Sequence, residues 1–106
     1  MFQIEKAGFD VLTEEEKATF EKLSSDYMTK IEMKLKNISS LKVHVKEYSR
    51  EGKRNKYSLH AKIVLPGKFF EASADDWDFA RTVHQLFKKI EEEIENRFRS
   101  SDQNKR

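Results

Sequence analysis

The chain has 106 residues, contains no cysteine and carries a net charge of only +2. This length predicts one compact domain, and the lack of cysteine excludes disulfides, thiolate metal sites and cysteine nucleophiles. No run approaches the ~18 apolar residues of a transmembrane helix, and no secretory signal is visible at the N-terminus. We therefore expect a soluble cytoplasmic protein with no membrane partner.

The charge is unevenly distributed along the chain. Residues 1–41 hold 6 Lys and Arg against 8 Asp and Glu, residues 42–68 hold 8 against 2, and residues 69–106 hold 7 against 9. The three parts therefore carry −2, +6 and −2. A polyanion responds to such a local cluster more than to the overall charge.

The first forty residues predict a short strand and a long helix. Residues 2–12 alternate weakly between apolar and polar types, which predicts an edge strand. Thr13 and Glu16 form a capping-box pattern, and no Gly or Pro interrupts the next 20 residues, so we expect a helix from Glu14 to Lys36. Its apolar stripe consists of Phe20, Leu23, Tyr27, Met28, Ile31, Leu35 and Ile38.

Two alternating runs, 41–46 and 57–63, are joined by the polar segment 49–55, which contains Gly52. This pattern predicts an antiparallel β-hairpin. Side chains alternate between the two faces of a strand, so one face is apolar, with Leu41, Val43, Val45, Leu59, Ala61 and Ile63. The other face is basic, with Lys42, His44, Lys46, His60 and Lys62.

After the turn at Pro66 and Gly67, residues 69–74 predict a further strand, and Asp75, Asp76 and Asp78 predict the capped start of a second helix. The stripe of that helix runs through Phe79, Val83, Leu86, Phe87, Ile90, Ile94 and Phe98. Residues 100–106 are polar and unpatterned, which predicts a disordered tail after a single domain of residues 1–99.

The order β-α-β-β-β-α predicts an α+β fold. Each helix has one apolar stripe and the sheet has one apolar face, so a two-layer sandwich buries all three. We expect a mixed four-stranded sheet with two long helices packed on one face. The basic face of the hairpin then stays open to water.

Several stretches, in this order, resemble the ribosome hibernation-promoting factor family, also called ribosome-associated inhibitor A or sigma-54 modulation proteins, in its short form. They are Phe9–Thr13, Lys30–Glu32, Leu41–Val45, Val64–Lys68, Phe70–Ala74, and the pair Asp78 and Phe79 followed by Val83, Leu86, Phe87, Lys89 and Ile90. The resemblance implies the β-α-β-β-β-α fold and a partner, the small ribosomal subunit with its rRNA. It further implies occlusion of the groove for mRNA and tRNA in resting cells, with a monomer or weak dimer as the oligomeric state.

The sequence also departs from the family. Glu91, Glu92 and Glu93 stand where the family tends to be basic, and Glu21 and Asp26 stand where Lys or Arg is common. Two alternatives therefore stay open: a protein-interaction module that has lost the RNA surface, and a general binder of structured RNA.

The basic hairpin is the best candidate for an RNA-binding site, because Lys and Arg neutralise phosphates. Its candidate residues are Lys42, His44, Lys46, Arg50, Lys53, Arg54, Lys56, His60 and Lys62. The resemblance adds Lys30, Lys34, Lys88 and Lys89 on the helices. The alternative is an ordinary solvated sheet face whose lysines discourage aggregation.

Other residues give weaker signals. Tyr48 and Tyr57 flank the loop and suit either base stacking or strand-end packing. His44 and His60 should be neighbours, but too few ligands accompany them for a metal site, and His84 is predicted to be structural. With no Gly-rich phosphate loop and no nucleophile placed beside a base, we expect no enzyme activity, cofactor, metal or small-molecule substrate.

Overall fold

The computed structural model describes residues 4–35, 38–50 and 54–104, and it describes the side chains in these ranges except those of residues 49–50, 54–55 and 97–104. The elements are β1 (Ile4–Ala7), a short 3-10 helix η1 (Phe9–Val11), α1 (Glu14–Lys34), β2 (Ser40–Arg50), β3 (Arg54–Leu65), β4 (Lys68–Asp76) and α2 (Phe79–Asn104). This order confirms the predicted α+β fold.

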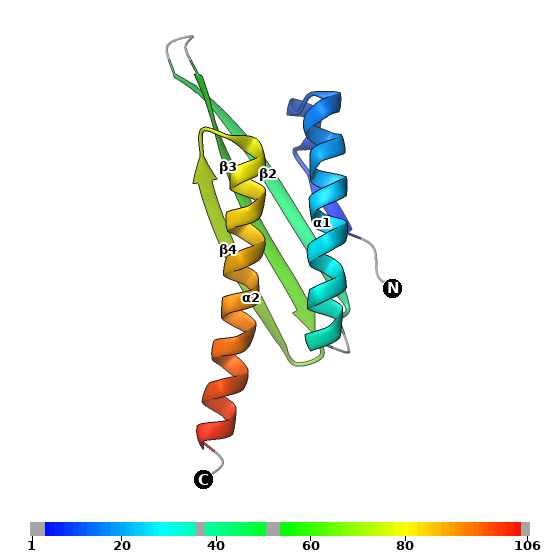
Figure 1. Ribbon diagram of the computed structural model, residues 1–106, viewed down its shortest axis with the longest axis vertical. Helices are drawn as coiled ribbons and strands as arrows, with labels where there is room; N and C mark the ends of the chain where they lie inside the picture. Colours follow the sequence, from blue (N-terminus) through cyan, green and yellow to red (C-terminus); the bar gives the residue numbers. More distant parts are fainter. Residues whose placement is uncertain (1–3, 36–37, 51–53, 105–106) are drawn as a thin grey trace.

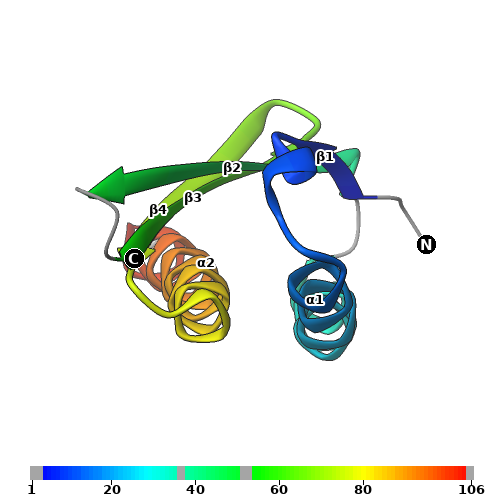
Figure 2. The same ribbon diagram turned by 90° about the horizontal axis from the view of Figure 1, so that it is seen from above.

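The four strands form one mixed sheet in the order β1-β2-β3-β4. β1 runs parallel to β2, and the other neighbours are antiparallel. Both helices lie on the same side of the sheet, as Figures 1 and 2 show. The opposite side, called the open face below, has no element over it among the described residues.

The sheet forms where the sequence alternates. Leu41, Val43 and Val45 of β2 are buried and lie opposite Ile63, Ala61 and Leu59 of β3. These residues form the floor of the core. The helices cover it with fully buried side chains at helical spacing: Phe20 and Ile31 from α1, and Val83, Leu86, Phe87, Ile90 and Ile94 from α2.

The start of α1 is a capping box, as predicted. The amide of Glu16 donates to Thr13 Oγ1 at 3.1 Å, and the amide of Thr13 donates to Glu16 Oε1 at 2.9 Å. Each residue thereby satisfies a helix-end amide that would otherwise lack a partner.

The N-terminal segment differs from its prediction, because only Ile4–Ala7 forms a strand and Phe9–Val11 forms a 3-10 turn. Gly8 separates them with φ +78°, a left-handed conformation that turns the chain out of the strand. α1 ends at Lys34; the predicted end at residues 36–37 lies outside the described residues.

The second helix also has different bounds. β4 continues to Asp76, which lies opposite Tyr57, so α2 begins at Phe79 and not at Asp75. At its other end α2 continues to Asn104, through most of the segment predicted as a tail. That segment lacks apolar residues but contains no Gly or Pro to stop a helix. Residues 105–106 lie outside the described residues.

Within the described parts of the chain, neither helix is long and apolar enough to cross a membrane.

Candidate nucleic-acid interface

Basic side chains line the middle of the open face. Alternation along the two central strands places them there, and we call them the central strip: Lys42, His44 and Lys46 of β2 with Lys56, His60 and Lys62 of β3. Lys42 lies directly opposite Lys62, and His44 lies directly opposite His60. The predicted proximity of the two histidines is confirmed.

The cross-strand pair Lys42–Lys62 has an electrostatic cost. Like charges directly opposite each other destabilise an antiparallel pair, by up to about 1 kcal/mol. In the same row, Glu5 of β1 lies beside Lys42, and Glu71 of β4 lies beside Lys62. Across the sheet, the row therefore consists of an acidic residue, two lysines and a second acidic residue. An anion bound between the two lysines would relieve the repulsion between their charges.

Three carboxylates border the central strip, and we call them the flanking carboxylates: Glu5, Glu71 and Asp75. Lys56 Nζ lies 3.9 Å from Asp75 Oδ2, and His60 Nε2 lies 3.9 Å from Glu71 Oε2. These contacts are long and partly exposed, so each adds little stability. The open face is therefore basic along its midline, with two carboxylates on its β4 side and one on its β1 side.

Exposed aromatic residues lie at both ends of the strip. Tyr48 is 51% exposed and lies opposite Lys56, whose ammonium group is 5.8 Å from the ring centroid of Trp77. At the other end, Phe69 is 47% exposed, and Lys62 Nζ lies 4.5 Å from the centre of its ring. Each end thus combines an aromatic ring with a lysine.

Tyr57 packs against the core and is not available to stack on RNA bases. Its side chain is buried, its ring packs edge-on against Phe79 at 5.3 Å, and its hydroxyl donates to Glu16 at 2.5 Å. Of the two tyrosines that flank the loop, only Tyr48 is exposed to a ligand.

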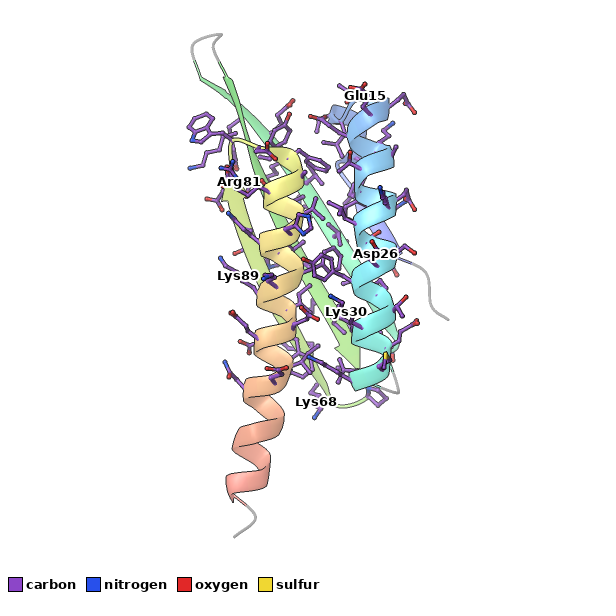
Figure 3. The ribbon with its side chains drawn as sticks, in the orientation of Figure 1. Glu15, Asp26, Lys30, Lys68, Arg81 and Lys89 are labelled. Carbon is purple, nitrogen blue, oxygen red and sulfur yellow. The ribbon has the colours of Figure 1, made fainter. Side chains whose placement is uncertain are left out.

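The four helix lysines do not join the central strip. Lys30 is exposed on α1, with its ammonium group 5.4 Å from the Tyr27 ring, and Lys88 is exposed on α2. Lys34 donates to Glu95 at 2.8 Å, and this hydrogen bond raises the pKa of the lysine. Lys89 donates to the Ser73 carbonyl at the edge of β4, at 2.9 Å. Figure 3 shows Lys30 and Lys89 on the helices.

Three further candidates belong to the hairpin tip. Lys53 lies outside the described residues. Arg50 and Arg54 lie opposite each other in the register of β2 and β3, but their side chains lie outside the described part. Their contribution to RNA binding stays a prediction.

The other polar residues have structural partners. The Tyr27 hydroxyl and His84 Nδ1 share a 2.8 Å hydrogen bond, and burial raises the pKa of Tyr27. Asp78 accepts from the amide of Arg81 at 2.8 Å, which caps α2. Asp76 accepts from two backbone amides, and the one from Asp78 contributes most to lowering its pKa. The hydrogen bond to Tyr27 agrees with the predicted structural role of His84. Of the three aspartates predicted to cap the second helix, only Asp78 does so, because Asp75 and Asp76 still belong to β4.

The acidic borders were not predicted from the sequence, although alternation along β4 is enough to place Glu71 on the outer face. The turn at Gly67 sets the register of β3 and β4, so counting forward along β4 and back along β3 from this turn places Asp75 opposite Ser58. Glu5 could not be placed in this way, because its position depends on which strand β1 joins. Among the described residues, no three His, Asp or Glu side chains are grouped so that they could hold a metal ion.

The chain is similar to two solved structures. One is a ribosomal subunit interface protein from Coxiella burnetii, which is 22% identical and has a TM-score of 0.62 over 90% of this chain and 93% of that chain. The other is the N-terminal domain of Thermus thermophilus Protein Y, 13% identical, with a TM-score of 0.56 over 88% and 92% of the two chains. No protein-family model and no curated protein sequence matches the chain. The chain therefore shares the fold of these two proteins, which is the fold that the resemblance in its sequence implies.

Proposed function

We propose that this protein is a ribosome-associated factor that binds rRNA of the small subunit through its open face. The observation that carries the proposal is the central strip, in which four lysines and two histidines project from two neighbouring strands. The shared fold with a protein described as a ribosomal subunit interface protein supports the choice of the ribosome as partner.

The strip suits binding to a phosphate backbone. A lysine that neutralises a phosphate releases condensed counterions, so the affinity should fall steeply as salt rises. Because the lysines project from a rigid sheet, their spacing is set before binding, and little backbone entropy is lost on complex formation. A sheet of fixed cations recognises backbone shape more than base sequence.

The proposed effect on translation needs no catalysis. A domain held on the small subunit in the groove for mRNA and tRNA would exclude both by occupying their volume. The protein would then act in the cytoplasm of resting cells as a non-enzymatic inhibitor of translation, as a monomer or weak dimer and without a cofactor.

The direct test is sedimentation of the purified protein with small ribosomal subunits. We expect it to pellet with the subunits at low salt and to be released by about 0.5 M salt. In a cell-free translation reaction, the same protein should lower the yield as its concentration rises. Failure to pellet with subunits at every salt concentration would reject the proposal.

Matched charge reversals locate the interface. The variant Lys42→Glu/Lys46→Glu/Lys62→Glu changes the central strip. The variant Lys22→Glu/Lys30→Glu/Lys88→Glu makes the same charge change at exposed helix positions. We expect the first to lose at least about tenfold in subunit affinity and the second to lose little, with both folded by circular dichroism. The reverse result would place the interface on the helices.

A second candidate is a protein-interaction module. A shallow hollow between β4 and α2 favours it, since its lining includes Glu71, Glu92 and Glu93, and Lys89 in the same hollow already bonds Ser73. This candidate predicts no subunit binding at any salt. A general binder of structured RNA would instead be displaced from subunits by unrelated duplex RNA.

A further inference from the structure

We propose that the open face binds an unpaired single strand of RNA that runs along β2 and β3, and that it binds a duplex poorly. This inference rests on the proposed function and specifies the form of RNA that the site takes. Three features carry it: the width of the central strip, the charge on either side of it, and the aromatic residues at its ends.

The strip is narrow and long. It is two strands wide, and neighbouring strands lie about 4.8 Å apart. From Lys56 to Lys62 it extends six residues along β3, which is about 20 Å at ~3.3 Å per residue. These dimensions accommodate one phosphate backbone with several nucleotides, in the range of about 4 or more that short single-strand sites hold.

The flanking carboxylates act against a second backbone. Glu71 and Asp75 border the strip on β4, and Glu5 borders it on β1. A duplex carries two phosphate rows separated by a groove that is wider than the strip. When one row lies over the lysines, the other lies near the carboxylates and is repelled. A single strand along the midline meets the basic side chains and Ser58, which lies opposite Lys46, but none of the flanking carboxylates.

The ends of the strip offer surfaces for base stacking. Tyr48 at one end and Phe69 at the other are about half exposed, and each lies beside a strip lysine. An aromatic ring stacks on any unpaired base, while bases inside a duplex are already stacked on one another. The imidazoles of His44 and His60 lie between these ends and can stack on further bases.

The test compares two fluorescent RNAs by anisotropy at one salt concentration: a 12-nucleotide single strand and a hairpin whose stem contains 12 base pairs. We expect the single strand to bind at least about tenfold more tightly. Tyr48→Ala and Phe69→Ala should each weaken single-strand binding by about tenfold, and Tyr48→Phe should retain it. Met33→Ala is the control, because Met33 is exposed on α1, in the other layer of the sandwich.

The outcomes separate this inference from the proposed function. Equal or tighter binding of the hairpin overturns the single-strand inference, as does a Tyr48→Ala variant that behaves like Met33→Ala. Binding to subunits without binding to either RNA also overturns it and leaves the proposed function standing. A clear single-strand preference without subunit binding supports the inference and rejects the ribosomal partner.

Discussion

Tyr57 and Glu16 join the sheet to the first turn of α1. The tyrosine hydroxyl donates to Glu16 Oε2 at 2.5 Å, and Glu16 Oε1 accepts from the amide of Thr13 at 2.9 Å. One carboxylate therefore completes the capping box and fastens the helix to β3. Since the Tyr57 ring also packs against Phe79 at the start of α2, this residue connects both helices with the hairpin.

Removing the hydroxyl should weaken this connection. We expect Tyr57→Phe to lower the free energy of unfolding by about 1.5 kcal/mol, because a carboxylate loses its donor at a largely buried position. Tyr48→Phe removes the same atom from an exposed ring and should change stability by less than about 0.5 kcal/mol. Urea denaturation of both variants measures the difference, and equal effects would contradict the role assigned to this hydrogen bond.

Stability should fall in alkaline solution. The hydrogen bond to Glu16 and then burial raise the pKa of Tyr57, and burial and then Glu91 raise the pKa of Tyr27. At high pH the folded chain therefore keeps protons that the unfolded chain has lost. The stabilising contribution is complete below the ordinary tyrosine pKa of about 10 and declines as pH rises above it.

The same two proteins test this dependence. Between about pH 9 and 11, the free energy of unfolding of the unmodified protein should fall more steeply than that of Tyr57→Phe, which lacks this titrating group. The two curves should converge as pH rises. The raised pKa of Lys34 affects both proteins equally and cancels in the comparison. Parallel curves would show that Tyr57 does not titrate differently in the two states.

Gly8 and Gly67 provide a matched pair for backbone strain. Both have positive φ, +78° and +82°. A Cβ at Gly67 would meet nothing within 4 Å, whereas a Cβ at Gly8 would overlap the carbonyl oxygen of Val45. Gly67→Ala should therefore cost only the left-handed conformation, about 1 kcal/mol. Gly8→Ala should cost at least about 2 kcal/mol more, because β1 must move away from β2. Equal losses in urea denaturation would show that β1 accommodates the side chain.

Much of the fold could be predicted because each element carries its own signal. The alternation from Leu41 gave the buried and open faces of the hairpin, and the Thr13 and Glu16 pair gave the start of α1. The ends of elements were less predictable. β4 continues past Ala74 because pairing with β3 continues, and that depends on a neighbour that local sequence does not show.

The candidate site could be predicted only in part for the same reason. Alternation assigned Lys42 and Lys62 to one face, and the hairpin register made them neighbours. Lys30 and Lys88 became candidates through the family resemblance, which carries no information on which surface of this chain binds. In the two-layer fold they lie in the helical layer, away from the central strip. The position of Glu5 required the parallel pairing of β1 with β2.

The flanking carboxylates lead to the last prediction, which concerns the choice between single-stranded and duplex RNA. Glu71→Gln/Asp75→Asn removes two negative charges from one border of the strip. Duplex RNA should then bind about fivefold more tightly, because both carboxylates lie within a Debye length, about 10 Å at 0.1 M salt, of a second phosphate row. Single-strand affinity should rise less, through release of Lys56 and His60 from their long contacts with these carboxylates.

The matched control is Glu15→Gln/Asp26→Asn, which removes two charges from α1, where Figure 3 shows both residues. It should leave the affinities for both RNAs unchanged, since these carboxylates lie in the helical layer. Anisotropy titrations of the single strand and the hairpin with both variants give four affinities to compare. If the control raises duplex binding as much as the β4 variant does, overall charge governs RNA binding and the position of Glu71 and Asp75 does not. If only the β4 variant reduces the difference in affinity between the single strand and the hairpin, Glu71 and Asp75 set the preference for a single strand.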